Sequence, residues 1–86
     1  MELKEQFEQA AADSKSLSEK PSNETLLQLY SLYKQGSIGD INTEPPSNPF
    51  DFVAKAKHEA WAGLKGKSNA EAMIDYVALI NKLKGH

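Results

Sequence analysis

The segment at residues 22–38 of this 86-residue chain, SNETLLQLYSLYKQGSI, carries four leucines, two tyrosines and one isoleucine. Its apolar side chains recur at spacings of three and four residues, which is the period of an α-helix with one buried face. Ser22 or Asn23 can accept a free backbone N–H at the start of the helix. Gly36 and then Gly39-Asp40 mark its end. The segment is therefore predicted to be the central helix of an all-helical fold.

Three further segments have the same period. The first runs from Leu3 to Leu17 and is expected to end before Lys20-Pro21, because proline disfavours a helical conformation in the residue before it. Asp51 is a suitable cap for the next helix, which is expected to end at Gly66 and to pack through Val53, Ala56, Ala60 and Leu64. Large rings at helical spacing in a small domain are usually buried, so the same interpretation places three more side chains in the core: Phe7, Phe52 and Trp61.

The last helix has the clearest start signal. Ser68 and Glu71 match a capping box, in which each side chain satisfies a free N–H of the other residue. Apolar residues then follow at helical spacing: Met73, Tyr76, Val77, Ile80 and Leu83. Between the second and third helices lies a long connection, residues 39–50, with prolines at 45, 46 and 49 that disfavour regular structure. A connection of this length is either functional or crosses over between helices.

The composition excludes several classes of function. A formal net charge of −2 is unsuited to general nucleic-acid binding, which needs a basic surface. The chain has no cysteine, which rules out thiol catalysis and disulfides and fits a reducing compartment. His58 and His86 are too few and too far apart for a metal cluster.

The length predicts a single domain over residues 1–86. Residues 1–5, MELKE, lack the apolar core of a signal peptide, and the longest apolar run is far shorter than a membrane span. We therefore expect a cytoplasmic protein. Sequence signatures of a nucleophile elbow, a phosphate-binding glycine loop, a zinc protease and a calcium loop are all absent, so binding is favoured over catalysis.

Two clusters of side chains are candidates for a binding site. Between residues 55 and 68 four lysines accompany one acid, which indicates either a solvated helix face or a small anion site. Tyr30, Tyr33 and Lys34 share one helix face, since they are three and four residues apart. Aromatic rings can stack on a base and a lysine can bind a phosphate. The alternative is a core face edged by polar groups.

The wider sequence resembles the acyl-CoA-binding proteins. The resemblance begins with residues 29–35, LYSLYKQ, and 38–44, IGDINTE. It continues through the remaining segments in order, with about one extra residue in the 45–50 loop. Those segments contain Phe7-Ala10-Ala11, Lys20-Pro21, Phe52, Lys55-Ala56-Lys57, Ala60-Trp61, Leu64-Lys65-Gly66, Ala72-Met73 and Tyr76.

The resemblance implies a four-helix bundle with a long overhand loop between helices 2 and 3. It also implies that medium- to long-chain acyl-CoA thioesters are the ligand and that no cofactor is needed. By position, Tyr30, Lys34 and Lys57 would hold the 3′-phosphate, and Tyr33 would lie beside the adenine. Lys15 and Tyr76 would line the path of the CoA and the acyl chain.

Three positions depart from the family pattern. His58 stands where a tryptophan beside the acyl chain is usual, and Val53 and Pro45 replace commonly basic residues. These departures leave the preferred chain length open. The family also implies a monomer that carries its ligand, contacts acyl-CoA-using enzymes and membrane surfaces transiently, and catalyses no reaction.

Rival classes make different predictions. A protein-interaction module would not be stabilised against heat by a CoA thioester alone. An acyl-CoA hydrolase would release thiol from the thioester. A peripheral membrane protein could use its amphipathic helices, although the acidic balance provides no polybasic anchor.

Overall fold

The computed structural model describes residues 2–85, and every regular element in that range is helical. Met1 and His86 lie outside the described residues, and the expectation for His86 is therefore not tested. The α-helices are α1 (Leu3–Asp13), α2 (Asn23–Ser37), α3 (Phe52–Ala62) and α4 (Asn69–Leu83), and a short 3-10 turn, η1 (Ser14–Ser16), follows α1. The predicted all-helical class and its four helices are confirmed.

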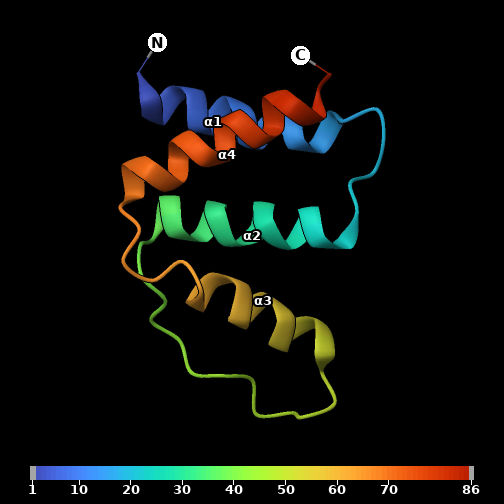
Figure 1. Cartoon of the computed structure of the whole chain (residues 1–86), viewed down its shortest axis with the longest axis vertical. Coiled ribbons are helices and arrows are strands. Elements are labelled where there is room, and N and C mark those ends of the chain that lie inside the picture. Colours follow the sequence, from blue (N-terminus) through green and yellow to red (C-terminus); the bar gives the residue numbers. More distant parts are fainter. Residues whose placement is uncertain (1, 86) are drawn as a thin grey trace.

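The helices form a flat bundle in which α1 and α4 run in one direction and α2 and α3 in the other (Figure 1). Contacts between helices link α1 to α4, α4 to α2, and α2 to α3. The long connection between α2 and α3 lies at one end of the longest axis, and the two termini lie at the other (Figure 1). The Cα extents of 40 × 28 × 15 Å show how thin the arrangement is.

Side-chain caps set the starts of three helices. The Ser22 hydroxyl accepts the Thr25 N–H, and the Asp51 carboxylate accepts the Ala54 N–H at 3.0 Å. The Ser68 hydroxyl accepts the Glu71 N–H at 3.1 Å. Only this half of the predicted capping box forms, because the Glu71 carboxylate contacts the Ser68 hydroxyl and not the backbone.

The core is built by three of the four helices. Its buried cluster comes from α1, α2 and α4 and consists of Phe7, Ala10, Leu29, Leu32, Ala72, Tyr76 and Ile80. Trp61 is the one buried residue of α3, and its indole N–H donates to the Gly39 carbonyl at 2.9 Å. The predictions for Phe7 and Trp61 are therefore confirmed.

The predictions for Phe52 and Val53 are wrong. Phe52 is 71% exposed and Val53 is 65% exposed. Both lie in the first turn of α3, whose main helix neighbour is α2, and their exposure shows that no helix covers this turn. Helical spacing places side chains on a common face, but it does not say whether another element covers that face.

Two other helix ends differ from the predictions. The first helix stops at Asp13 and tightens into η1, where the Ser14 hydroxyl donates to the Ala11 carbonyl. The third helix stops at Ala62, four residues before Gly66. Gly66 has φ of 96° and Gly39 has φ of 112°, a region that side chains with a Cβ rarely adopt. Glycine is therefore required at the turns that follow α2 and α3.

A polar cluster holds these turns together. The side-chain amide of Gln35, fully buried at the end of α2, donates to the Asp40 carboxylate at 2.9 Å and to the Lys67 carbonyl at 2.7 Å. The same oxygen of Asp40 accepts the Gly66 N–H at 2.8 Å. Asn69 then donates to the carbonyls of Gln35 and Gly36. The end of α2 is thus fixed to the start of α4.

Acid should weaken this cluster. The Gly66 N–H, followed by the Gln35 amide, lowers the pKa of Asp40 from its ordinary value of 3.8. The stabilisation is present above that value and is lost as the pH falls through the lowered pKa of the folded state. The Asp40→Asn variant keeps an acceptor oxygen but has no carboxylate to protonate. We expect its free energy of unfolding to fall less than that of the parent when the pH is lowered from neutral to acid, as followed by circular dichroism.

Asp40→Ala is the matched control, since it removes the acceptor and should lower stability at neutral pH as well. Asp13 supplies a separate acid sensitivity, because its hydrogen bond from Lys84 also lowers its pKa. An acid profile of Asp40→Asn that superimposes on that of the parent would contradict the role given to Asp40.

Candidate functional site

A groove of about 1010 Å³ runs along α1, η1, α2 and α4. Its volume is at the upper end of the range for small-molecule sites, which are mostly apolar with a few polar groups. Its apolar lining includes Phe7, Ala11, Leu17, Leu26, Leu29 and Met73. Its polar lining includes Lys4, Glu8, Lys15, Tyr30, Tyr33 and Tyr76. The groove therefore suits a long ligand that is apolar in part and anionic in part.

Three aromatic rings from three helices form one wall of the groove. Phe7 stacks on Tyr33 with ring centroids 5.3 Å apart, and meets Tyr76 edge-on at 5.2 Å. Tyr33 and Tyr76 are 5.9 Å apart. Tyr33 remains 42% exposed and can offer ring surface to a ligand, whereas Tyr76 is buried. Burial raises the pKa of the Tyr76 phenol, so its hydroxyl keeps its proton at neutral pH.

Two ammonium groups converge on the ring of Tyr30. The Lys57 Nζ lies 5.4 Å from the ring centroid and the Lys34 Nζ lies 5.8 Å from it. Lys34 is also 5.9 Å from the ring of Trp61. Neither lysine forms an ion pair within residues 2–85. This arrangement concentrates unpaired positive charge at the junction of α2 and α3 and is well suited to an anion.

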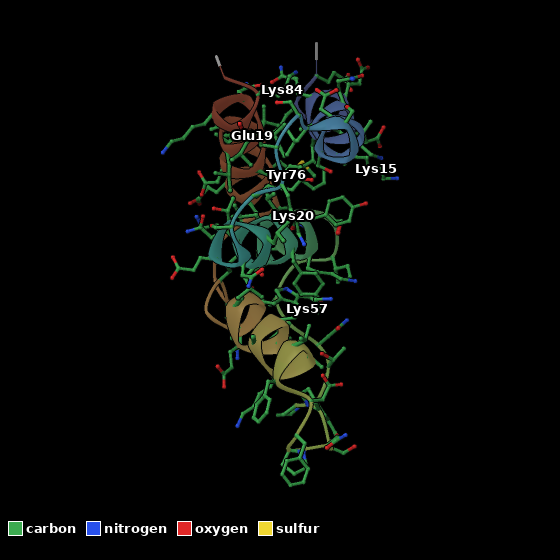
Figure 2. The ribbon with its side chains drawn as sticks, turned by 90° about the vertical axis from the view of Figure 1, so that its right-hand side faces the viewer. Lys15, Glu19, Lys20, Lys57, Tyr76 and Lys84 are labelled. Carbon is green, nitrogen blue, oxygen red and sulfur yellow. The ribbon has the colours of Figure 1, made fainter. Side chains whose placement is uncertain are left out.

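The six predicted site residues fall into two groups. Lys15, Tyr30, Tyr33 and Tyr76 line the groove. Lys34 and Lys57 lie outside its lining and join it through the ring of Tyr30. In Figure 2 Lys15 and Tyr76 lie at the level of α1 and α4, and Lys57 lies lower, where α3 approaches α2. Four of the predicted residues therefore share the groove, and the two lysines adjoin it at Tyr30.

His58 connects the long loop to α3. Its Nε2 lies 3.3 Å from the Thr43 carbonyl. The side chain is half-buried, which agrees with a position at the edge of the helix. It thus contributes to the placement of the loop.

Lys4, Glu8 and Leu26 also line the groove and were not among the predicted site residues. A signal for the first two was available. Lys4, Glu8 and Lys15 follow one another at four and seven residues, so they lie along one stripe of the first helical segment. Which face of α1 the groove uses depends on α2 and α4, and the spacing alone does not specify it.

The described residues 2–85 contain no group of three or more His, Cys, Asp or Glu side chains that could hold a metal ion. Within the same range, every helix is too short or too polar to cross a bilayer.

The fold and the groove define a small helical protein with a site suited to an amphipathic anion, and the comparisons identify its family. Residues 4–80 match the acyl CoA binding protein family, and the chain belongs to that family. It is 45% identical to an acyl-CoA-binding protein of Ricinus communis over 85 residues, which cover 99% of this chain and 93% of the relative. It is 49% identical to an acyl-CoA-binding protein of Dictyostelium discoideum over 77 residues, 90% of each chain.

The fold of the family is also found in solved structures. The crystal structure of acyl-CoA-binding protein 2 from Oryza sativa superimposes with a TM-score of 0.89 at 40% identity, covering 95% of this chain and 90% of that one. The overhand connection between α2 and α3, expected from the family resemblance, is therefore confirmed together with the four-helix bundle.

The aromatic wall should be sensitive to a single methyl group. A Cβ at Gly36 would lie 3.0 Å from Phe7 Cζ and 3.3 Å from Met73 Cγ. Phe7 cannot easily retreat, because Tyr33 and Tyr76 pack on it. We expect Gly36→Ala to lower the melting temperature, since overpacking costs about 1–3 kcal/mol and the gain in helix propensity is about 1 kcal/mol.

Gly63→Ala is the control, because its Cβ would meet other atoms only at 3.5 Å. Thermal denaturation should show no loss for Gly63→Ala. Equal melting temperatures for Gly36→Ala and the parent would show that the wall repacks freely.

Proposed function

We propose that this protein binds medium- to long-chain acyl-CoA thioesters non-covalently, and that it buffers and transports them in the cytoplasm without catalysing a reaction. The observation that carries the proposal is the convergence of Lys34 and Lys57 on the ring of Tyr30 beside an apolar groove. Family membership supports acyl-CoA as the ligand.

The proposed roles divide between the two parts of the site. Tyr30, Lys34 and Lys57 hold the 3′-phosphate of the nucleotide, where two ammonium groups can offset its charge. Tyr33 stacks beside the adenine with the exposed part of its ring. Lys15 and Tyr76 line the path of the CoA and the acyl chain. The four groove residues and the two flanking lysines would then contact a single ligand.

The acyl chain supplies most of the affinity in this proposal. Burying about 14 methylenes at ~0.8 kcal/mol each gives roughly 11 kcal/mol before costs. Ordering the ligand and the side chains offsets several kcal/mol of this. The phosphate contacts add specificity, because a free fatty acid has a single carboxylate at the end of its chain and no nucleotide phosphate to place beside Lys34 and Lys57.

A carrier of this kind needs few other features. We propose a single domain over residues 1–86 that acts as a monomer, requires no cofactor, and meets acyl-CoA-using enzymes and membrane surfaces only transiently. Holding the acyl chain away from water would prevent its detergent action, and release would depend on the competing affinity of the acceptor.

Calorimetric titration tests the ligand. We expect palmitoyl-CoA to bind far more tightly than CoA alone, because CoA lacks the apolar chain, and palmitate to bind poorly, because it lacks the phosphates. Thiol release should not accompany binding. Superimposable isotherms for palmitate and palmitoyl-CoA would refute the proposal, and steady thiol release would indicate an enzyme.

A double-mutant cycle tests the phosphate site. Lys34→Ala should weaken palmitoyl-CoA by about tenfold or more, since a charge-assisted hydrogen bond contributes about 1.5–3 kcal/mol. The variant should differ little from the parent towards the analogue that lacks the 3′-phosphate. Tyr30→Phe should give the same pattern with a smaller loss, because it removes one hydroxyl and keeps the ring.

Lys82→Ala is the matched control for net charge, since Lys82 is exposed on the last turn of α4. It should bind both ligands as the parent does. If Lys34→Ala lowers the affinity for palmitoyl-CoA and for the analogue without the 3′-phosphate by the same factor, this lysine does not recognise the 3′-phosphate, even if acyl-CoA is the ligand. The melting temperature of the free Lys57→Ala variant should stay close to that of the parent, which separates a ligand contact from a structural one.

A further inference from the structure

Three polar side chains gather at the end of the groove where α1, α2 and the start of α4 meet. Glu8, Ser37 and Asn69 all line the groove. Ser37 follows Gly36, and the Asn69 side chain donates to the Gly36 carbonyl at 3.1 Å. Glu8 follows Phe7, whose Cζ lies 3.0 Å from the position that a Cβ at Gly36 would take. The three side chains, here called the acceptor rim, therefore belong to one end of the groove.

Each side chain of the acceptor rim can only accept a hydrogen bond from a ligand. The Ser37 hydroxyl donates its single proton to the Tyr33 carbonyl at 2.7 Å. The side-chain amide of Asn69 donates to two backbone carbonyls in the last turn of α2, so its oxygen is the atom available to a ligand. The carboxylate of Glu8 has no proton to donate. The acceptor rim therefore suits a ligand group that carries N–H or O–H donors.

The charge of Glu8 makes this requirement stricter. A carboxylate in the lining of a groove for an anionic ligand repels the phosphates of that ligand. Glu8 forms no ion pair within residues 2–85, although Lys4 lies one turn before it on α1. The acceptor rim also lies at the C-terminal end of α2, where the helix macrodipole adds negative potential. A donor group on the ligand would offset this cost through a charge-assisted hydrogen bond.

The ring of Tyr33 indicates which kind of group carries the donors. Tyr33 is 42% exposed, lines the groove, and stacks on Phe7 with an interplanar angle of 21°. A flat heterocycle can pack on such a ring. An amino group in the plane of that heterocycle would project beyond its edge and could reach acceptors at the border of the ring. The ring and the acceptor rim together fit an amino-substituted heterocycle.

We infer that the acceptor rim, with Glu8 as its charged member, recognises the exocyclic amino group of adenine and makes the groove selective for adenine among purine nucleotides. The inference rests on the proposed function, in which Tyr33 lies beside the adenine of acyl-CoA. Adenine presents two N–H donors on this amino group, next to ring nitrogens that accept. Lys4 and the Tyr33 hydroxyl are donors at the same end of the groove, and a ring nitrogen can accept from either. A purine with hydrogen in place of the amino group offers the acceptor rim no donor there.

The direction of the ligand along α2 agrees with this assignment. Tyr30, which Lys34 and Lys57 approach to 5.8 and 5.4 Å, marks the proposed phosphate site. Tyr33 follows Tyr30 by three residues and Ser37 follows Tyr33 by four, so the three lie in order along one face over about 10.5 Å of helical rise. The ribose carries the 3′-phosphate, and the amino group is at the edge of the base away from the ribose. Phosphate, base and amino group would then meet Tyr30, Tyr33 and Ser37 in that order.

Calorimetric titration with two ligands tests the inference. One ligand is palmitoyl-CoA, and the other is the analogue in which unsubstituted purine replaces adenine. We expect the parent to bind the purine analogue about tenfold more weakly, which is the lower range for a hydrogen bond to a charged group. Glu8→Ala should reduce this ratio to about threefold or less. It should weaken palmitoyl-CoA alone and should not weaken the purine analogue, because a charge that repels the phosphates has been removed.

Three further variants separate recognition from charge and from fold. Glu8→Gln keeps an acceptor oxygen without the charge, so its ratio should lie between those of the parent and Glu8→Ala. Ser37→Ala removes a neutral acceptor and should reduce the ratio by less than Glu8→Ala does. Glu5→Ala removes the same charge from an exposed position of α1 outside the groove lining. Its ratio should equal that of the parent.

The outcomes distinguish this inference from the proposed function. If the parent binds palmitoyl-CoA and the purine analogue equally, the amino group is not recognised, and the inference fails while acyl-CoA remains the ligand. If Glu8→Ala raises the affinity for both ligands by the same factor, the acid only repels the phosphates, and the inference again fails. If the parent does not bind palmitoyl-CoA, the proposed function and the inference are both overturned.

Discussion

The buried side-chain amide of Gln35 is the constraint on which the rest of the structure depends. Both of its N–H groups are used, one on Asp40 and one on the Lys67 carbonyl. These bonds join the end of α2 to the turn that follows it and to the connection before α4, which lies 32 residues further along the chain. Because both partners are acceptors, they also fix which end of the amide is nitrogen. The Gln35 side-chain oxygen is buried without a partner among residues 2–85, so the network is specified by the two N–H bonds, whose loss would leave two further buried groups unpaired.

Two features of the candidate site follow from that junction. The network places Asn69, at the start of α4, against the carbonyls of Gln35 and Gly36. The direction of α4 relative to α2 is thereby set, and Tyr76 comes to lie 5.9 Å from Tyr33. Gly36 provides the close approach that Phe7 needs to complete the aromatic wall. The groove is therefore a consequence of how α2 and α4 are joined.

The flatness of the bundle explains why the protein offers two different surfaces. Its helices are arranged in the order α1, α4, α2 and α3, so α3 packs mainly on α2. The groove opens along α1, η1, α2 and α4. The start of α3 is left uncovered and presents Phe50 and Phe52 to solvent. A four-helix bundle with a closed core would have buried both surfaces.

The sequence by itself determined the helices and three of their caps, because these depend on local spacing. Ser22, Asp51 and Ser68 cap helices as predicted, and Tyr30, Tyr33 and Lys34 share a face because of the helical period. Only the tertiary structure decided which faces are covered. Phe52 and Trp61 lie on the same helix with similar local signals, yet one is exposed and the other is buried. The tertiary structure also brought Lys57 of α3 to Tyr30 of α2, since contact between residues distant in the chain depends on the packing of whole helices.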